Sequence, residues 1–322
     1  MNVAVIIINF RTPDYTIACL ASLEPERARV PGLRVTLVEN ASGDDSLERI
    51  NAAIAERGWS SWVEVLPQSR NLGFAGGNNA GLRHVLAASP APDYLLLLNS
   101  DTLVHPGCLA ACLERMRNTP DIGILSAMLR NRDGSVQNVC RRFPTPWRET
   151  VRAIGLPYVF RGAFEWAELE DAGWDRETTA CDVEWVGGAF MLLHAETVRR
   201  LGGMDESFFF YGEDIEYCHR MHRNGLRVFF DPAGAITHFG GGSSDATRLH
   251  NRRKEVLIWK ARFHVQRVCY GPLAALWLRL LYILVFTAKV AWYAVTLRWK
   301  SPGMRGAVSG WTVLTRPLEV PT

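Results

Sequence analysis

The sequence of 322 residues lacks the features that mark several protein classes. Its seven cysteines have no paired spacing, which predicts free thiols in a reducing compartment and not a disulfide framework. The opening MNVAVIIINF has no basic residue before its short apolar run, so we expect a first β-strand and not a secretory signal. Internal repeats and low-complexity segments are absent as well. With 48% hydrophobic residues, the chain can build one large domain or two smaller ones.

Two binding motifs are also missing. The glycine-rich stretch RNLGFAGGNNAG (70–81) does not have the GxGxxG spacing of a dinucleotide-binding loop. Cys108 and Cys112 are one helical turn apart and close to His105, but no fourth ligand is near them in the sequence. We therefore expect core cysteines on one face of a helix and not a zinc site.

Acidic residues are almost absent from the C-terminal region. Residues 248–300 contain eleven Lys and Arg and a single acid, Glu255, whereas the whole chain has a net charge of +3. The rest of the chain is therefore net negative, and the basic block indicates an anionic partner, either nucleic acid or a membrane surface. Because the block is rich in Trp, Leu and Val and lacks interleaved exposed aromatics, we expect no nucleic acid.

Apolar runs of strand length alternate with helical segments over the first hundred residues, which predicts βαβ units around a parallel sheet. Strands are expected at 3–9, 33–39, 62–66 and 94–98, and helices at 15–23, 46–57 and 75–88. Polar motifs follow the ends of these strands, at the edge where open α/β sheets bind ligands. Beyond residue 121 the pattern loosens, and the stretch 133–182 predicts long connections that line an acceptor groove. Further elements are expected at 184–193 (strand), 214–223 (helix) and 226–230 (strand).

Three of the polar motifs are candidate ligand sites, and each has a structural alternative. Asp101 of NSDT follows a buried run, where one carboxylate can hold a hard divalent cation together with phosphate oxygens, or else cap the next turn. The glycines and asparagines of 70–81 allow backbone N–H groups to approach an anion, or else form a simple turn and helix start. ENAS, which begins at Glu39, can hydrogen-bond a base or ribose, or serve the turn itself.

Two further candidates lie later in the chain. His238 ends the stretch DPAGAITH before flexible glycines and serines, so it is either a structural histidine or part of a magnesium or manganese site with Asp101. In FFFYGEDIEYCHRM (208–221), aromatics that are expected in the core lead directly to Glu213 and Asp214 at a helix start. A helix N-terminus favours a charged carboxylate, so Asp214 can be a cap, a catalytic base, or both.

Taken together and in their order along the chain, these motifs resemble those of the family-2 inverting glycosyltransferases of the GT-A fold, and more narrowly those of their bacterial rhamnosyltransferase-like branch. The resemblance spans residues 3–244 and is carried by VIIINFRT, VENASGDDS, RNLGFAGGNNAG, LLLLNSDT, WVGGAFMLL, GGMDESFFFYGEDIEYCHRMHRNG and the His238 region. It implies an α/β fold with a mostly parallel, Rossmann-like central sheet flanked by helices. It also implies a catalytic domain at 1–245, with nucleotide-sugar binding in about 1–120 and the acceptor and catalytic part in about 121–245.

The resemblance further implies a role for each matching residue. Donor contacts are expected from Asn9, Arg11, Glu39, Asn71, Gly73, Asn78, Asn99 and Asp101. Acceptor contacts are expected from Trp185, Gly187, Gly188 and Tyr211. Asp101 and His238 would hold Mg²⁺ or Mn²⁺, Asp214 would be the base, and Glu213 would orient it or bind acceptor hydroxyls. Two positions depart from the family pattern, since Glu39 stands where Asp is usual and the metal motif Asn-Ser-Asp has only one acid.

The implied reaction is a single inverting displacement, in which a sugar moves from a nucleoside diphosphate to a hydroxyl of a glycan or lipid-linked saccharide. Bacterial cell-surface polysaccharide synthesis is the expected context. L-Rhamnose from dTDP-rhamnose is the first expectation, and another UDP- or dTDP-hexose is the alternative. A sugar-nucleotide nucleotidyltransferase would share the crevice and the metal but would need no base on the acceptor side.

Residues 246–322 are expected to form a basic, amphipathic helical extension. Arg279 and Lys289 interrupt the apolar stretch 271–297, so neither uninterrupted run reaches the ~18 residues of a membrane span. A helical wheel places Leu273, Trp277, Leu280, Leu284 and Val295 on one side and Arg279, Tyr282, Lys289 and Tyr293 on the other. With the cluster Arg252, Arg253, Lys254, Lys260, Arg262 and Arg267, and with Trp277, Trp292 and Trp299, this predicts an interfacial anchor on anionic lipid. The alternative is a helix packed on the catalytic domain or on a second subunit in a homodimer. The expected location is the cytoplasm, peripheral to the inner face of the cell membrane.

Overall fold

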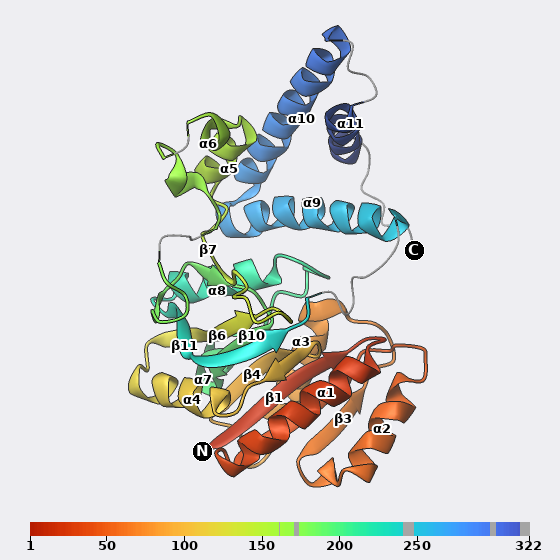
Figure 1. Cartoon of the computed structure of the whole chain (residues 1–322), viewed down its shortest axis with the longest axis vertical. Coiled ribbons are helices and arrows are strands. Elements are labelled where there is room, and N and C mark those ends of the chain that lie inside the picture. The colour runs from red at the N-terminus through yellow and green to blue at the C-terminus, as the bar shows by residue number, and fades with distance from the viewer. Residues whose placement is uncertain (161, 171–173, 241–247, 297–300, 316–322) are drawn as a thin grey trace. The chain divides into compact units, whose positions relative to one another are not determined.

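The structure, a computed structural model, describes residues 1–160, 162–170, 174–240, 248–296 and 301–315. Side chains of 248–255 and of some residues in 301–315 are not described, so the predicted cluster Arg252, Arg253 and Lys254 and the predicted interfacial Trp299 lie outside the described residues. The chain forms two compact units (Figure 1). The first unit consists of Met1–Arg141 and Glu170–Asp245, and the second of Arg142–Leu169 and Ala246–Thr322.

Four parallel strands and three helices open the first unit and confirm the predicted βαβ units to within two residues. The strands are β1 (Asn2–Asn9), β2 (Gly32–Glu39), β3 (Val63–Pro67) and β4 (Tyr94–Asn99), in the spatial order β3-β2-β1-β4. The helices are α1 (Pro13–Leu23), α2 (Ser46–Glu56) and α3 (Gly73–Leu86), with the short 3₁₀ turns η1 (Glu24–Ala28) and η2 (Trp59–Ser61). The central strands β1 and β4 are almost entirely buried, as expected for a sheet covered on both faces.

The remaining strands extend this sheet on the side of β4. They are β5 (Thr102–Val104), β6 (Ile122–Arg130), β8 (Cys181–Asp182), β10 (Phe190–His194) and β11 (Arg227–His238). The order continues β4-β10-β6-β11-β5, and β8 pairs with β11. Within the described residues the sheet has nine strands, of which β5, β8 and β10 run against the others. The predicted α/β fold with a mostly parallel central sheet is confirmed.

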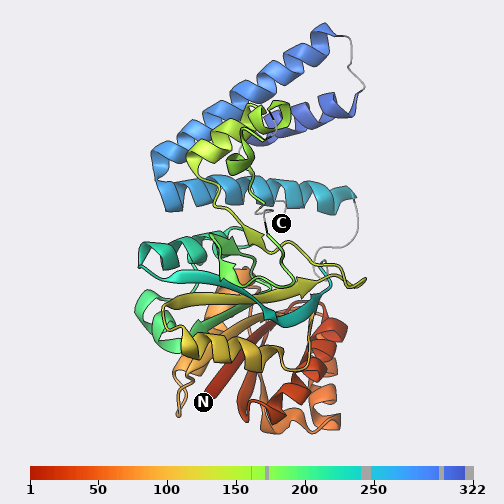
Figure 2. The same ribbon diagram turned by 60° about the vertical axis from the view of Figure 1, so that its left-hand side comes forward.

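Helices cover both faces of this sheet (Figure 1, Figure 2). From β1 the chain moves outward through α1 to β2 and through α2 to β3, in one direction across the sheet. Helix α3 then leads back in the opposite direction to β4, which lies on the other side of β1. Because such crossovers are right-handed, α3 covers the face opposite to α1 and α2. The second half of the unit adds α4 (Cys108–Asn118), α7 (Ala195–Leu201) and α8 (Glu213–Arg223), and a small sheet of β7 (Cys140–Arg141) with β9 (Trp185–Val186). Cys108 and Cys112 are buried on α4, as predicted.

Two predicted strands differ from the observed ones. The expected strand 184–193 is divided by Gly187, Gly188 and Ala189 into β9, which pairs with β7, and β10, which enters the main sheet. The expected strand 226–230 and the strand DPAGAITH, which was expected to end at His238, form one strand with an irregular register between Asp231 and Ala235. Proline at 232 has no N–H to donate to a regular ladder, and the irregularity accommodates it.

The second unit is helical throughout its described elements. They are α5 (Pro146–Ala153), α6 (Leu156–Val159), η3 (Glu165–Ala167), α9 (Arg248–Tyr270), α10 (Pro272–Val295) and α11 (Pro302–Thr315). The helical character predicted for the C-terminal region is confirmed. Leu278, Leu281 and Tyr282 of α10 form a buried cluster with Leu314 of α11. In contrast to the prediction from the interrupted apolar run, α10 is long and apolar enough to cross a membrane, with a mean hydropathy of 1.8 over its best window.

Candidate active site

The carboxyl ends of three neighbouring strands meet at one edge of the sheet. Asn9 at the end of β1 is in register with Glu39 at the end of β2, and Ile8 is in register with Asn99 at the end of β4. The register therefore places the predicted donor-binding residues of these strands along one edge. In an open α/β sheet this edge is where ligands bind.

Backbone strain is concentrated in the loops at this site. Among the described residues, the non-glycine residues with positive φ are Arg11 (59°), Ala41 (55°) and Tyr211 (72°). Arg11 follows β1, Ala41 follows β2, and Tyr211 precedes α8. Non-glycine residues in this conformation persist only when the surrounding structure holds them, and they cluster at functional sites.

Asn9 and Glu39 use their side chains to build the turns beside β1 and β2. Asn9 is fully buried, and its amide accepts from the Thr16 hydroxyl at 2.9 Å and donates to the Ser42 hydroxyl at 3.2 Å. Glu39 accepts the backbone N–H of Ser42 at 2.9 Å. The exposed Arg11 donates to the Ser42 carbonyl at 2.8 Å. Ser42 is thus the common partner, which the sequence signalled only as part of the ENAS motif. The Glu39 carboxylate serves this turn, and its donor contact stays a prediction.

The glycine-rich loop rests on the segment that leads to Glu213 and Asp214. Gly73 has φ 72°, and a Cβ there would lie 2.4 Å from the Phe209 carbonyl oxygen, so glycine is required. Phe74 donates its backbone N–H to the same oxygen at 2.9 Å. The Asn71 side chain accepts the Gly73 N–H at 2.8 Å and the Asn40 amide at 3.0 Å. Asn40 belongs to the ENAS motif, and its partner Asn71 lies 31 residues further along the chain.

Asparagines further along α3 fasten the helix. Asn78 is buried and donates to the Phe74 carbonyl at 3.1 Å. The side chain of Asn79 accepts the backbone N–H of Met204 at 2.9 Å and donates to its carbonyl oxygen at 2.8 Å. These contacts join α3 to the loop before α8, and a donor contact by Asn78 stays a prediction.

The two predicted metal ligands lie next to each other. His238 at the end of β11 pairs in register with Thr102, the residue after Asp101. The backbone N–H of Phe239 donates to the Asp101 carbonyl at 2.9 Å, which holds the two segments of the chain together. Nε2 of His238 lies 3.4 Å from Oδ1 of Asp101, and both side chains are largely buried. The backbone pairing of β5 and β11 therefore creates the juxtaposition.

Gln137 orients His238. Its amide nitrogen donates to the His238 carbonyl and to Asn131 Oδ1, both at 2.7 Å, so its oxygen must be the acceptor facing Nδ1 of His238 at 2.9 Å. Nδ1 is then the donor to Gln137, and Nε2 is the nitrogen that faces Asp101. No local pattern in the sequence pointed to Gln137.

A carboxylate oxygen and an unprotonated imidazole nitrogen suit Mg²⁺ or Mn²⁺. Within the part of the chain that the structure describes, no group of three or more His, Cys, Asp or Glu side chains could hold a metal. A cation at Asp101 and His238 would therefore complete its coordination with phosphate oxygens and water, which is how Mg²⁺ is commonly held in phosphate-binding sites. The residues present fit a metal that binds together with a diphosphate.

Asp214 and Glu213 open α8 side by side. Gly212, with φ 94°, precedes the helix. Oδ1 of Asp214 accepts the backbone N–H of Ile215 at 2.9 Å, and its carboxylate also receives the backbone N–H of Gly188. Glu213 is buried, and its Oε2 has no hydrogen-bond partner among the residues that the structure describes. Asp214 can therefore accept backbone N–H groups at the start of the helix and still act as a base.

Burial separates the proton affinities of this pair. The pKa of Glu213 is raised by burial first and by the neighbouring charge of Asp214 second. Burial also raises the pKa of Asp214, to about 6, while backbone N–H groups and the charge of Arg141 act in the opposite direction. Asp214 is thus the more acidic partner, so near neutral pH Asp214 carries the charge and Glu213 holds a proton.

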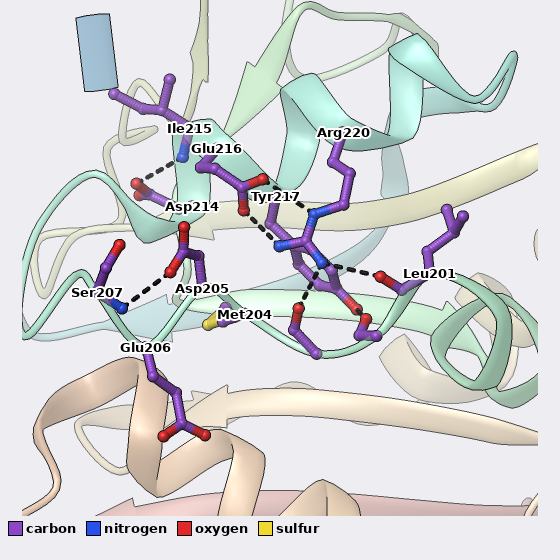
Figure 3. A network of polar contacts seen from close by, with 12 residues as sticks. Leu201, Met204, Asp205, Glu206, Ser207, Asp214, Ile215, Glu216, Tyr217 and Arg220 are labelled. Atoms are coloured by element: carbon purple, nitrogen blue, oxygen red, sulfur yellow. Dashed lines mark hydrogen bonds and ion pairs between the residues drawn. The ribbon is translucent and has the colours of Figure 1, made fainter. Parts of the chain in front are cut away.

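The opposite side of α8 is fixed by an ion pair (Figure 3). The Arg220 guanidinium pairs with Glu216 one turn earlier, at 2.9 Å from Nε to Oε1, and donates to the Leu201 carbonyl at 3.0 Å. The same guanidinium lies over the ring of Tyr217, 5.1 Å from its centroid. These contacts tie α8 to the end of α7, so Asp214 stands on a rigid helix.

The aromatic run before α8 is less buried than predicted. Phe208 is in the core, but Phe209 is 54% exposed. The ring of Phe210 lies 6.3 Å from that of Phe74, edge to face. A Cβ at Gly188 would come within 3.1 Å of the Phe74 ring. Glycine at 188 therefore lets Phe74 pack against the stretch between β9 and β10 whose backbone binds Asp214, and the aromatic run supports the loop more than the core.

One short stretch joins the metal pair to the candidate base. The backbone N–H of Asn99 donates to the Ala189 carbonyl at 3.0 Å, and the adjacent Gly188 donates to Asp214. Asp101 follows Asn99 by two residues. The predicted cation site and the predicted base are therefore attached to one edge of the sheet, at the end of β4 and the start of β10.

The predicted acceptor residues lie around β9. Trp185 is in register with Arg141 of β7, whose guanidinium carbon lies 5.8 Å from the indole centroid. The charge of Arg141 also acts on the pKa of Asp214, so the sequence reasoning missed a basic residue at this site. Tyr211 is partly buried, and burial together with the charge of Glu213 raises its pKa. The acceptor roles of Trp185, Gly187, Gly188 and Tyr211 stay predictions.

A protein family and two characterised proteins that this chain resembles are glycosyltransferases. The model of a family described as glycosyltransferase like family 2 matches residues 1–256. The chain is 26% identical over 211 residues to an N-acetylglucosaminyl-diphospho-decaprenol L-rhamnosyltransferase of Mycobacterium tuberculosis, covering 63% of this chain and 68% of that protein. It is 37% identical over 172 residues to the rhamnosyltransferase WbbL of Escherichia coli, covering 52% of this chain and 61% of WbbL.

Two solved structures share the architecture. A mannosyltransferase from Pyrobaculum calidifontis, in complex with GDP-Man and Mn²⁺, superposes with a TM-score of 0.55 at 16% identity, covering 97% of this chain and 84% of that one. GalNAc-T7 with UDP, GalNAc and Mn²⁺ superposes with a TM-score of 0.56 at 12% identity, covering 82% and 50%. At such identities the likeness shows the fold alone, and it confirms the predicted GT-A fold.

Proposed function

This chain belongs to glycosyltransferase family 2, and from that premise we propose that it moves a sugar from a nucleoside diphosphate to a hydroxyl group of a glycan or lipid-linked saccharide. The names of the relatives support L-rhamnose as the transferred sugar. The donor we propose is dTDP-rhamnose, with another UDP- or dTDP-hexose as the alternative, and the proposed role is bacterial cell-surface polysaccharide synthesis. We place the enzyme at the cytoplasmic face of the membrane, with an anionic lipid surface as a partner.

The attachment of Asp101, His238 and Asp214 to one edge of the sheet carries this proposal. Asp214, charged near neutral pH and fixed by two backbone N–H groups, accepts the proton of the attacking hydroxyl. Glu213, which holds its proton, donates a hydrogen bond to the acceptor sugar or to Asp214. A single displacement by that hydroxyl, with the diphosphate leaving from the opposite face of the sugar, inverts the anomeric configuration.

The residues on the donor side are proposed to bind the nucleotide sugar and to neutralise its diphosphate. Mg²⁺ or Mn²⁺, held by Asp101 and His238, would supply neutralisation of the negative charge that grows on the leaving diphosphate. Gln137 keeps the Nε2 lone pair of His238 directed to that position. Arg11 and the glycine-rich loop at Asn71 and Gly73 are proposed to contact the nucleotide sugar, with Asn9, Glu39 and Asn78 shaping the surrounding turns.

The test is a panel of nucleotide sugars screened for thermal stabilisation, with and without Mn²⁺. We expect one donor to stabilise the chain only when the metal is present, and Asp101→Asn to abolish that shift while it leaves the unliganded melting temperature within a few degrees. Stabilisation by a nucleoside triphosphate with a sugar phosphate, in place of any nucleotide sugar, would favour a nucleotidyltransferase. Metal-independent stabilisation would overturn the assignment of Asp101 and His238.

A further inference from the structure

Exposed large hydrophobic side chains are concentrated in the second unit. Among the described side chains all of them lie there except Met1 and Phe209. One group runs along α10 and includes Leu273, Trp277, Leu280 and Leu284, each more than half exposed. A second group lies on the segment 146–166 and includes Trp147, Tyr158, Val159 and Phe160, also more than half exposed. Exposed apolar surface on this scale marks an interaction site.

We propose that the second unit docks on an anionic lipid surface through a composite face, formed by the exposed side of α10 together with the segment 146–166. This extends the proposed membrane location, on which it rests. The segment lies far from α10 in the sequence and within the part that the family resemblance assigns to the catalytic domain. The composite face therefore makes that segment a lipid-contacting element.

The two halves of the composite face are fastened to each other. The indole nitrogen of Trp277 on α10 donates to the Thr150 hydroxyl of α5 at 2.9 Å, and the Trp277 ring is still 54% exposed. The Tyr282 hydroxyl donates to Glu149 Oε2 at 3.2 Å, and Arg262 Nε of α9 donates to the same carboxylate oxygen at 2.8 Å. Both views show α5 beside the first half of α10 (Figure 1, Figure 2). Trp277, which is itself exposed, therefore links α10 directly to α5.

Charge and side-chain type favour lipid as the occupant. The second unit contains seventeen Lys and Arg against five Asp and Glu, in a chain whose net charge is only +3. Every tryptophan that is exposed among the described side chains belongs to this unit: Trp147, Trp166, Trp277, Trp292 and Trp311. Indole rings, aliphatic side chains and an excess of positive charge are the composition of surfaces that sit at the headgroup boundary. A second copy of the same unit would be repelled by its charge.

The packing of α10 favours a helix that lies along the lipid surface. Leu278, Leu281 and Tyr282 are buried against the rest of the unit, and Arg279 donates to the Leu314 carbonyl of α11 at 2.9 Å. One side of α10 is thus occupied by protein and the other is free. A helix with one free apolar side can place that side in the interface while its packed side stays with the protein.

The experiment measures binding of the full chain to vesicles of phosphatidylcholine alone or mixed with phosphatidylglycerol. Tyr158→Ser/Phe160→Ser alters the segment, Leu280→Ser/Leu284→Ser alters α10, and Phe209→Ser is the matched control in the first unit. Each double variant should lower the partition coefficient on the anionic vesicles about tenfold or more, because two large apolar side chains leave the interface. The control should bind as the wild type does, and binding should weaken with salt.

Quenching of tryptophan fluorescence by brominated lipid gives a second measurement that does not depend on the serine variants. Quenching should fall in Trp147→Phe, since that indole belongs to the segment. If the α10 variant loses binding while the segment variant and Trp147→Phe behave as the wild type, the membrane location stands and the composite face is wrong. If the wild type dimerises without lipid and both double variants are monomeric, the face belongs to a second copy and the proposal is overturned.

Discussion

Replacement of Asp214 by asparagine tests the proposed base with little change in shape. In the wild type the carboxylate accepts the backbone N–H groups of Ile215 and Gly188. An amide has one oxygen for these two donors, so one N–H meets an NH₂ group, and a lost buried hydrogen bond costs about 1–3 kcal/mol. Removal of a buried charge offsets part of this. We expect Asp214→Asn to lower the melting temperature by at most about 10 °C.

The effect on turnover should be far larger than the effect on stability. Loss of a positioned general base lowers the rate about 10²- to 10⁴-fold, which corresponds to about 2.7–5.5 kcal/mol in the barrier. The assay is release of nucleoside diphosphate at saturating donor and acceptor, beside thermal stabilisation by the donor, which should persist. Asp205→Asn is the matched control, because Asp205 caps a nearby turn through the Ser207 N–H at 2.8 Å (Figure 3). Its turnover should stay close to that of the wild type.

The pH dependence of turnover provides a second test of Asp214 as the base. Asp214 must be charged to accept a proton, and its pKa is raised to about 6, so wild-type turnover should fall as pH drops through that value. The residual turnover of Asp214→Asn should lack this decline. Turnover within about threefold of the wild type, or an unchanged acid decline in the variant, would refute the role of Asp214 as base.

Two other predictions concern Gln137, the partner of His238, and Glu213, the neighbour of Asp214. Gln137→Leu should weaken Mn²⁺ binding about 10- to 100-fold in the presence of a nucleoside diphosphate. Gln137→Glu, which still accepts from Nδ1 of His238, should lose less affinity, and equal affinities of the two variants in a Mn²⁺ titration would contradict the role of Gln137. The raised pKa of Glu213 means that its protonated form stabilises the fold at low pH and that this contribution is lost as pH rises through about 8. Glu213→Gln, which does not ionise, should therefore match the wild type in melting temperature near pH 5 and exceed it above pH 8. An equal difference at both pH values would argue against a buried ionisable Glu213.

Much of the fold was predictable because its signals are local. The continuous apolar run of β1 marks a buried strand within its own residues, and the polar, glycine-containing stretches between such runs mark turns in the same way. Other features had no such signal. The expected strand 184–193 divides because β9 pairs with β7 and β10 enters the main sheet, and Phe209 looked like core because its neighbours are aromatic. Periodicity describes one element at a time, so it does not reveal which partner an element meets.

The sequence by itself determined the order of strands and helices, the family, and the presence of acids and glycines where strands end. Only the tertiary structure decided that β10 enters the sheet beside β4, so that residues 188 and 189 connect the end of that strand to Asp214. It likewise brought Gln137 to His238 and joined residues 142–169 to the C-terminal helices. The physical reason is that such contacts form between groups that are far apart along the chain, from about 25 residues for Gly188 and Asp214 to about 100 for Gln137 and His238. Their hydrogen bonds and buried surfaces exist only after the chain has closed, and they leave no pattern along it.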